Sequence, residues 1–448
     1  MIWPFKAKAA SPKIDIDSAD AGMLDGLQKA AFDYFAKVTN PRNGLVADRT
    51  LDNSPCSIAV VGLALSAYPV GVERGWIRRD EAVELSLTAM RFFWHSDQTG
   101  VAESSGFKGF YFHFLDMADG KRVWDCELSI IDTALLIAGF LTSAAYFTKR
   151  TPLETELREL ADALYRRIDW NWAQAGGSAV VHGWMPGHGF LDYGWEGYSE
   201  ALILYVLGLG SPTHRLSSES FIAWTMTYQW ENLYGQDFLY AGPLFIHQLS
   251  HAWIDLRDIR DRFMREKRSD YFENSRRATI VQREYGQRNP LDFQGYARDI
   301  WGLSAGEGPS AQTVTYAGRS QAFYGYAARG VPYGPDDGTV AGSAALNSLA
   351  FAPDVALPVV RALHARDSPE RSRTVLAGGF NASVIDAAGQ GWISIGDFGF
   401  DQGLTVLSIE NFRSGLLWKL TRAIPYFRTG LSRAGFKGGW LRKRTSSW

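Results

Sequence analysis

Long apolar segments with helical periodicity recur along almost the whole chain, and they restrict the fold more than any other feature. Residues 57–68 combine apolar and small side chains, and residues 127–148 and 197–209 are mostly apolar after their first turn. A helix that is apolar on nearly every face has to be buried in a large core. Further helices are predicted at residues 24–38, 81–95, 152–168, 217–230, 243–265, 271–287, 342–349, 353–366 and 402–421.

The order of these helices predicts a single all-α domain. A chain of 448 residues is typical of about two or three domains, but no linker or shift in composition divides it. Helical hairpins in series predict an (α/α)6 toroid over residues 21–425, with long aromatic loops over a central cleft. Residues 1–20 are predicted to be a flexible leader and residues 426–448 a C-terminal tail. Short strands are expected at residues 109–114, 178–183 and 391–395, and a loop over the cleft at residues 317–339.

Charge and aromatic content limit the classes of partner. The formal net charge is −2, so the chain lacks the basic field that nucleic-acid binding uses. The longest uncharged stretch, residues 133–147, is too short to span a bilayer. The first residues contain no apolar segment of signal-peptide length, so we expect a cytoplasmic protein, or a periplasmic or secreted one if a signal was removed. The 16 Trp, 19 Tyr and 26 Phe suit stacking on sugar rings, and they suit a large core equally well.

Two stretches place acids beside aromatics at the entrance of apolar helices. Glu127 and Asp132 precede one apolar run, and Glu196 and Glu200 precede another. Burying an unpaired carboxylate is costly, so a core helix has little reason to begin with one. Acids at the mouths of core helices are what general acid–base chemistry requires. We therefore hypothesise an enzyme that acts on sugars.

Helical geometry separates these acids. Five residues place Glu127 and Asp132 about 140° apart on a straight helix, so both can face one bond only if Glu127 lies in the entry turn. Asp132 also fits a structural acid that caps or bridges helices, and Glu127 fits an N-terminal acid favoured by the helix dipole. Glu200 directly precedes its apolar run, so burial is expected to raise its pKa, as a general acid near neutral pH requires. The alternative for Glu196 and Glu200 is an ordinary amphipathic surface turn.

The remaining motifs are less specific. His247 and His251 are four residues apart, but Gln248 stands where a zinc protease has its catalytic Glu. We therefore expect no metal there, and polar contacts or substrate hydrogen bonds instead. Asp336 and Asp337 fit a turn, a cation loop or a pair of acids in the cleft. A GxSxG nucleophile elbow, which would indicate ester hydrolysis, is missing from the sequence.

Taken in order, these and neighbouring segments resemble the bacterial glucoamylase-like family that includes endo-β-1,2-glucanases, glycoside hydrolase family 144. The match extends from about residue 24 to residue 420. It rests on residues 44–49 (GLVADR), 57–62 (SIAVVG), 109–114 (GFYFHF), 127–135 (ELSIIDTAL), 198–202 (YSEAL), 242–247 (GPLFIH), 250–255 (SHAWID), 301–303 (WGL), 336–339 (DDGT) and 410–411 (EN).

The resemblance implies an (α/α)6 toroid and hydrolysis of β-glucan, with β-1,2-glucan or sophoro-oligosaccharides as the leading substrate. It also implies that acids on the Glu127, Asp132 and Glu200 segments line the cleft. Residues 311–326 look like an insertion, and the tail after Arg422 departs from the family pattern. An insertion there is expected to affect exo or endo action and product length.

From these considerations we predict a glycosidase with Glu200 as general acid and Glu127 or Asp132 as base or water-positioning partner, with inversion favoured. The alternatives are an exo-acting sophorose-releasing enzyme, a transglycosylase and a non-catalytic glucan-binding protein. Hydrolysis of starch is a fourth alternative, with less support in the sequence. No cofactor, metal or nucleic-acid partner is expected, and the oligomeric state is undetermined. The predicted substrate-binding residues are Asp48, Arg49, Tyr111, His113, Trp195, Glu196, Tyr198, His247, His251, Trp301, Asp336 and Asp337.

Overall fold

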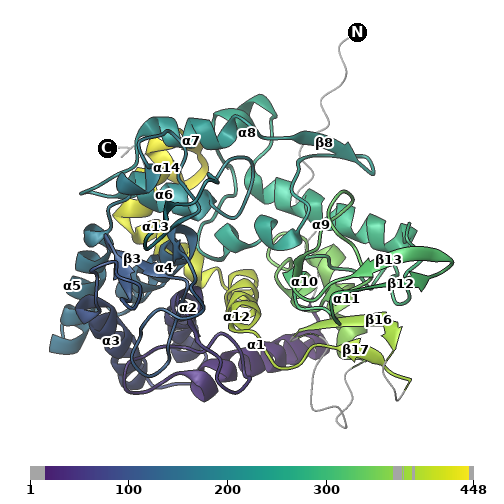
Figure 1. Ribbon diagram of the computed structural model, residues 1–448, viewed down its shortest axis with the longest axis horizontal. Helices are drawn as coiled ribbons and strands as arrows, with labels where there is room; N and C mark the ends of the chain where they lie inside the picture. Colours follow the sequence, from purple (N-terminus) through teal and green to yellow (C-terminus); the bar gives the residue numbers. More distant parts are fainter. Residues whose placement is uncertain (1–15, 367–375, 377, 386–388, 443–448) are drawn as a thin grey trace.

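The protein is described from a computed structural model, which covers residues 16–366, 376, 378–385 and 389–442. Two layers of helices alternate along the chain as an (α/α)6 toroid (Figure 1). The inner layer contains α2 (Ile58–Glu73), α4 (Ile130–Tyr146), α6 (Leu202–Gly210), the 3-10 helices η2 (Leu244–His247) and η3 (Leu249–Ala252), α10 (Ser343–Leu346) and α12 (Gly399–Arg413). The outer layer contains α1 (Ser18–Val38), α3 (Arg79–His95), α5 (Pro152–Arg167), α7 (Ser218–Thr225), α9 (Tyr271–Arg288) and α11 (Pro353–His364).

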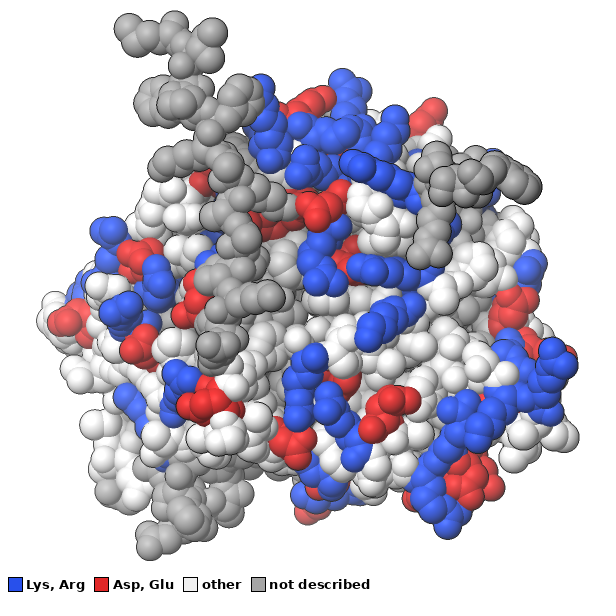
Figure 2. All heavy atoms as spheres, turned by 180° about the vertical axis from the view of Figure 1, so that it is seen from behind, with Lys and Arg blue, Asp and Glu red and all other residues white. Residues whose placement is uncertain are grey.

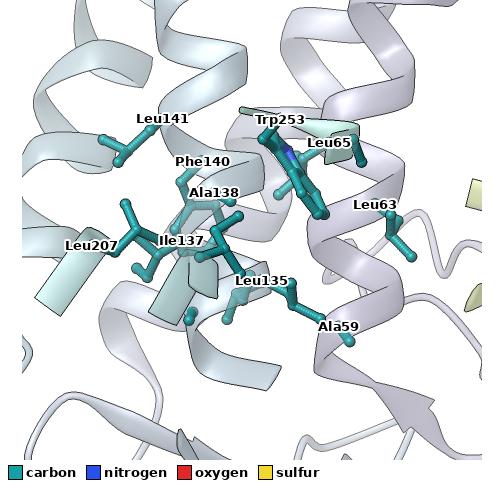
Figure 3. Close-up of a cluster of buried hydrophobic side chains, with 14 of the residues drawn as sticks. Ala59, Leu63, Leu65, Leu135, Ile137, Ala138, Phe140, Leu141, Leu207 and Trp253 are labelled. Atoms are coloured by element: carbon teal, nitrogen blue, oxygen red, sulfur yellow. The ribbon is translucent and has the colours of Figure 1, made fainter. Parts of the chain in front are cut away.

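Small side chains let the inner helices pack closely at the centre of the molecule. A Cβ on Gly62 of α2 would lie 2.3 Å from the Leu135 carbonyl oxygen of α4, and a Cβ on Gly139 would lie 2.2 Å from that of Gly62. Only glycine permits this approach at both positions. Around the crossing, apolar side chains of α2 and α4 gather with Trp253 (Figure 3). The apolar composition of these segments thus determines which helices become the inner layer.

The outer helices are amphipathic and capped by side chains. In α5, Leu157, Ala161 and Leu164 are buried at helical spacing. The Thr151 side chain accepts a hydrogen bond from the backbone N–H of Glu154, and Asp270 does the same for Glu273 of α9. Such caps satisfy N–H groups that lack partners in the first turn of a helix.

Short antiparallel strands make up the loops between the helices. Five of them form one sheet in the order β2 (Gly106–Phe107), β3 (Phe110–Phe112), β5 (Leu128–Ser129), β6 (Gly183–Met185) and β7 (Gly189–Phe190). In its register Leu128 lies opposite both Phe112 and Trp184. The predicted insertion forms a hairpin of β12 (Gln312–Tyr316) and β13 (Arg319–Phe323), and a second sheet contains β15 (Val340–Ala341), β16 (Gly379–Ile385) and β17 (Gly391–Ile393).

The remaining strands pair in twos. They are β1 (Cys56–Ser57) with β4 (Phe114–Leu115), β8 (Trp230–Leu233) with β9 (Gln236–Leu239), β10 (Ile259–Arg260) with β18 (Lys437–Gly438), and β11 (Ala305–Gly306) with β14 (Ala327–Ala328). The other helical elements are α8 (Arg262–Glu266), α13 (Leu416–Ala423), α14 (Pro425–Arg433), η1 (Trp172–Gln174) and η4 (Gly439–Leu441).

Two predicted helices are broken. Residues 243–265 form η2, η3, β10 and the start of α8 instead of one helix. The reason is that other helices use the carbonyl groups of this segment: the His247 carbonyl accepts from Ser275 Oγ (2.7 Å), and the His251 carbonyl accepts from Trp418 Nε1 (2.7 Å). Residues 402–421 divide into α12 and α13 because Gly415, at φ +66°, ends the regular helix.

The helix predicted at residues 127–148 begins three residues late, at Ile130, because Leu128 and Ser129 pair as β5. Residues 425–441, most of which were predicted to be a tail, form α14, β18 and η4, and α14 packs on α6. The predicted leader lies largely outside the described residues, and α1 begins at Ser18.

Hydrogen bonds bring the N-terminal ends of several inner helices to one rim of the toroid. The backbone N–H of Ile58 (α2) donates to the His113 carbonyl at 3.3 Å, and that of Ile130 (α4) donates to the His182 carbonyl at 3.5 Å. The N–H of Gly399 (α12) donates to the Asp48 carbonyl at 2.8 Å. The loops that carry these carbonyls therefore cover the rim.

Cations gather elsewhere on the molecule. Residues 411–448 contain no Asp or Glu, and Figure 2 shows Lys and Arg side chains concentrated in the upper part of the rear view. Some of them stabilise helix ends: Arg433 of α14 donates to the Leu209 carbonyl (2.6 Å) in the last turn of α6, where cations are favoured. In the described part of the chain, no helix has the length and apolarity needed to cross a bilayer.

Candidate active site

Three carboxylates stand at the N-terminal ends of three inner helices. Glu200 lies in the turn before α6, Asp132 lies in the first turn of α4, and Asp401 lies in the first turn of α12. Each is partly exposed. With Asp48, His113 and Glu127 they form what we call the rim cluster. The positive ends of the helix dipoles favour negative charge at these positions.

Glu200 is the rim-cluster carboxyl that is best suited to hold a proton near neutral pH. Burial raises the pKa of its carboxyl to about 7, and the nearby Asp132 carboxylate adds to this effect. The predicted rise in its pKa follows from its position against the apolar α6. A carboxyl with such a pKa can donate a proton at neutral pH.

Glu127 and Asp132 both reach His113, from different directions. His113 Nδ1 lies 2.9 Å from Glu127 Oε1, and His113 Nε2 lies 3.6 Å from Asp132 Oδ2. The separation of about 140° expected for Glu127 and Asp132 on one straight helix does not apply. Glu127 is in extended backbone before β5 rather than on the helix. Asp132 also accepts from Ser129 Oγ at 2.5 Å. Burial alone would raise the pKa of Glu127, but the hydrogen bond and charge of His113 outweigh it and lower that pKa.

Sequence reasoning did not select Asp401 and Tyr326. Burial raises the pKa of Asp401 to about 6, while Ser343 Oγ donates to it at 2.8 Å. An acid in the first turn of an apolar helix is the signal that selected Asp132, and it was available for Asp401 as well. Tyr326 ends the predicted insertion. It is 74% exposed, yet the surrounding protein, together with the carboxylates of Asp401, Asp48, Glu200 and Asp132, raises its pKa to about 12.

Asp48 and Arg49 lie in the loop that reaches α12. Burial raises the pKa of Asp48, although His113 and Arg49 oppose this effect. Arg49 Nη1 lies 3.9 Å from Glu307 Oε1. Glu307 and Asp401 line a small pocket whose other walls are mainly Gly, Ala and Ser. The predicted residues Asp48, Arg49 and His113 therefore lie with Glu127, Asp132 and Glu200 on one rim.

Aromatic side chains close to these residues are exposed. Trp124 is 61% exposed and packs at 5.0 Å from Phe114, the residue after His113. Tyr193 is 74% exposed and packs against His182, which stacks on Trp195 at 4.0 Å. Trp195 is itself 8% exposed. Exposed indole and phenol rings offer flat faces to sugar rings.

The other predicted binding residues are placed less favourably. Glu196 is exposed, and the structure gives it no role in the rim cluster. Tyr198 packs among Tyr228, Tyr271 and His247, on the side of α9. Tyr111 and Trp301 are buried, and the Tyr111 hydroxyl donates to the Phe93 carbonyl at 2.8 Å. Neither ring has an exposed surface for a ligand, so we do not retain Tyr111 and Trp301 among the proposed binding residues.

His247 and His251 also belong to the interior. His247 Nε2 lies 3.2 Å from the Ala241 carbonyl, and His251 Nε2 lies 2.9 Å from Ser275 Oγ. Burial lowers the pKa of His247 to about 4 and that of His251 to about 3. Both rings are therefore neutral hydrogen-bonding groups of the core, so we do not retain them among the proposed binding residues.

The Asp336–Asp337 motif is a structural turn. Asp337 is fully buried and forms hydrogen bonds with Arg329 Nε (2.7 Å) and Nη2 (2.8 Å). Asp336 accepts from Tyr285 and Tyr296, both at 2.7 Å. These three partner residues lie within the β11–β16 part of the chain or on α9 and the loop that follows it. Of the three interpretations of this motif, these contacts favour the turn, so we do not retain Asp336 and Asp337 among the proposed binding residues.

Known proteins share this architecture and sequence. Residues 192–425 match the model of a family described as putative glucoamylase. A putative glucoamylase from Bacteroides uniformis is 26% identical, with a TM-score of 0.83 over 96% of this chain and 100% of that chain. An endo-β-1,2-glucanase from Chitinophaga pinensis, solved with sophorotriose and glucose, is 26% identical, with a TM-score of 0.81 over 95% of this chain and 100% of that chain.

A longer relative matches as well. An exo β-1,2-glucooligosaccharide sophorohydrolase (non-reducing end) from Parabacteroides distasonis is 25% identical over 92% of this chain. The matched region is 58% of that protein, so this chain spans less than two thirds of its length.

Proposed function

This chain belongs to the putative glucoamylase family, and we propose that it is a glycoside hydrolase that cleaves β-1,2-glucan or sophoro-oligosaccharides. The observation that carries the proposal is Glu200, a carboxyl with a pKa of about 7, beside the Asp132 carboxylate. The exposed rings of Trp124 and Tyr193 suit a carbohydrate ligand. The named activities of the Chitinophaga and Parabacteroides relatives support the β-1,2 linkage.

In the proposed reaction Glu200 donates its proton to the glycosidic oxygen as the bond to the anomeric carbon breaks. A water attacks that carbon from the opposite face and loses its proton to a carboxylate, which gives inversion. Asp132 is our first candidate for this base, because it acts on Glu200 electrostatically and faces His113. Asp401 is the second, on the neighbouring helix end. Glu127 is bound to His113 at 2.9 Å, so we assign it to support rather than to the base.

Substrate linkage is tested with a panel of β-1,2-, β-1,3-, β-1,4- and α-1,4-glucans in a reducing-sugar assay. We expect reducing sugar to be released from β-1,2-glucan alone, or from β-1,2-glucan far faster than from the other three glucans. Release only from the α-1,4-glucan would favour starch hydrolysis. Calorimetric binding of β-1,2-glucan without release over long incubation would overturn hydrolysis in favour of a glucan-binding protein.

The mode of cleavage is tested by chromatography of the products. A single sophorose peak from the start indicates exo action, a ladder of products indicates endo action, and products longer than the substrate indicate transglycosylation. We attribute product length to Tyr326, which ends the insertion, because the carboxylates of four rim-cluster residues act on it electrostatically. Proton NMR of the first product distinguishes inversion from retention.

A further inference from the structure

We propose that His113 is a positioning residue whose doubly protonated ring bridges Glu127 and Asp132 and keeps both carboxylates oriented and ionised. The inference deepens the proposed function, since it assigns to His113 a role in the same site that acts through its neighbours. The two ring nitrogens face the two carboxylates separately, Nδ1 at 2.9 Å from Glu127 and Nε2 at 3.6 Å from Asp132.

The ring of His113 is held in place from several sides. Its plane stacks on Phe114, with centroids 4.0 Å apart and 11° between planes. The backbone N–H of His113 donates to the Glu127 carbonyl at 3.0 Å, and its carbonyl accepts from Ile58 at 3.3 Å. The loop that carries the ring is therefore tied to the start of both α2 and β5. A ring fixed in this way cannot turn away when either carboxylate changes its charge.

The charges around the ring favour the cationic form. Glu127, Asp132 and Asp48 act on the ring from three segments, and the charge of Arg122 acts on Glu127. Burial opposes the cation, but these carboxylates raise the pKa of His113 to about 9. Nδ1 forms a hydrogen bond with Glu127 at 2.9 Å, and Nε2 forms an ion pair with Asp132 at 3.6 Å. A neutral ring has only one N–H, so attraction to both carboxylates favours imidazolium.

A divalent cation is the rival occupant of this place. Ligand atoms of His113, Glu127 and Asp132 all lie within 4.8 Å of one another. A metal ion would bind one ring nitrogen and exclude its proton. Here each ring nitrogen is nearest to a different carboxylate, Nδ1 in a hydrogen bond with Glu127 and Nε2 in an ion pair with Asp132, which favours an imidazolium between two carboxylates over a shared coordination centre.

The bridge also acts on Glu200 through Asp132. His113 holds the Asp132 carboxylate in an ion pair at 3.6 Å, and the negative charge on Asp132 in turn favours the protonated form of Glu200. His113 thus acts on the proposed acid Glu200 through the proposed base Asp132.

Two neutral variants test the two halves of the bridge. His113→Asn places an amide N–H near the Nδ1 position toward Glu127, and His113→Gln places one near the Nε2 position toward Asp132. Both lack the charge. We expect kcat on β-1,2-glucan to fall more than 10-fold in both, with a smaller change in KM. The acidic limb of the pH–rate profile should move upward by about 1–3 pH units, because the carboxylates lose a neighbouring cation. His188→Gln, at an exposed histidine outside the rim cluster, serves as the matched control.

Two further measurements make the outcomes decisive. NMR titration of the His113 ring in the full chain should give a pKa well above 6.5 that falls in Glu127→Gln and Asp132→Asn; this readout does not require glycosidase activity, so it separates this proposal from the proposed function. A ring pKa near or below 6.5, or a pH–rate profile unchanged in both variants, would overturn the bridge. Loss of wild-type activity in EDTA and its return with a divalent metal would overturn it in favour of a metal site.

Discussion

The rim cluster and the Asp336–Asp337 turn contain the same chemical groups in opposite environments. Asp337 is fully buried and its carboxylate is paired with Arg329 through two hydrogen bonds, while Asp336 is bound by two tyrosine hydroxyls. Glu200, Asp132 and Asp401 are partly exposed at helix ends, and none of the ion pairs found among the described residues joins them to Arg or Lys. The turn has its charges neutralised, whereas the rim keeps carboxyl groups available for proton transfer.

This difference shows how to distinguish a structural acid from a reactive one in an apolar chain. Arg329 lowers the pKa of Asp337 against the effect of burial, so its carboxylate is ionised at neutral pH. Burial without a cationic partner raises the pKa of Glu200 to about 7. The partner, rather than the acid itself, determines the role.

Substitution of Glu200 should have the largest effect on activity. Glu200→Gln removes the proposed proton donor while preserving shape, and general acid catalysis typically contributes about 100- to 10,000-fold. We expect a loss of kcat in this range on β-1,2-glucan in a variant that still folds. Glu219→Gln, an exposed acid in the first turn of α7, is the control. Turnover near that of wild type in Glu200→Gln would show that the acid assignment is wrong.

Substitution in the buried Asp336–Asp337 turn should lower the free energy of unfolding and have much less effect on kcat. Asp337→Asn leaves the guanidinium of Arg329, which is 1% exposed, without its charge partner, and breaking a buried pair typically costs about 3–5 kcal/mol. Urea unfolding should reveal that loss, while kcat per folded molecule falls far less than in Glu200→Gln. If instead activity disappears with stability intact, Asp337 belongs to the active site.

The proton on Glu200 should make stability depend on pH. Its pKa is about 7 in the folded chain and 4.5 for an unperturbed Glu, so the folded state binds this proton more tightly. Between these values the unfolded chain releases the proton first, and stability falls as pH rises. The free energy of unfolding of Glu200→Gln should therefore rise relative to that of wild type from pH 4.5 to 7, and the difference should stay constant above pH 7. A difference in free energy of unfolding that does not change with pH would contradict the raised pKa.

Glu196 should show the smallest effect. It lies four residues before Glu200 but is exposed, and surface substitutions typically change the free energy of unfolding by less than about 0.5 kcal/mol. Glu196→Gln should leave kcat and KM close to wild type. A large rise in KM would restore Glu196 to the substrate-binding residues.

Helix positions and their layer were predictable because burial leaves a periodic apolar pattern. The segments around Gly62, Leu135 and Leu204 are apolar on nearly every face, and the sequence places them inside the toroid for that reason. The prediction of continuous helices failed at residues 243–265, where carbonyl groups accept hydrogen bonds from distant side chains, and at Gly415, where the backbone enters the left-handed region. The apolar periodicity of a segment indicates neither its distant hydrogen-bond partners nor such a change of backbone conformation.

For the candidate site, an acid at the start of an apolar helix is a local signal, and it selected Glu200 and Asp132 as candidates from the sequence. Glu127, His113 and Asp48 were candidates as well, but that these groups lie together follows from the tertiary structure. His113 is 14 residues from Glu127 in the chain, and Asp401 comes from the last inner helix, so their proximity depends on closure of the toroid. His247, His251, Asp336 and Asp337 looked equally reactive in sequence. Their partners Ser275, Ala241, Tyr285 and Arg329 are supplied by the fold, and it is the partner that decides whether a polar side chain is satisfied or free to react.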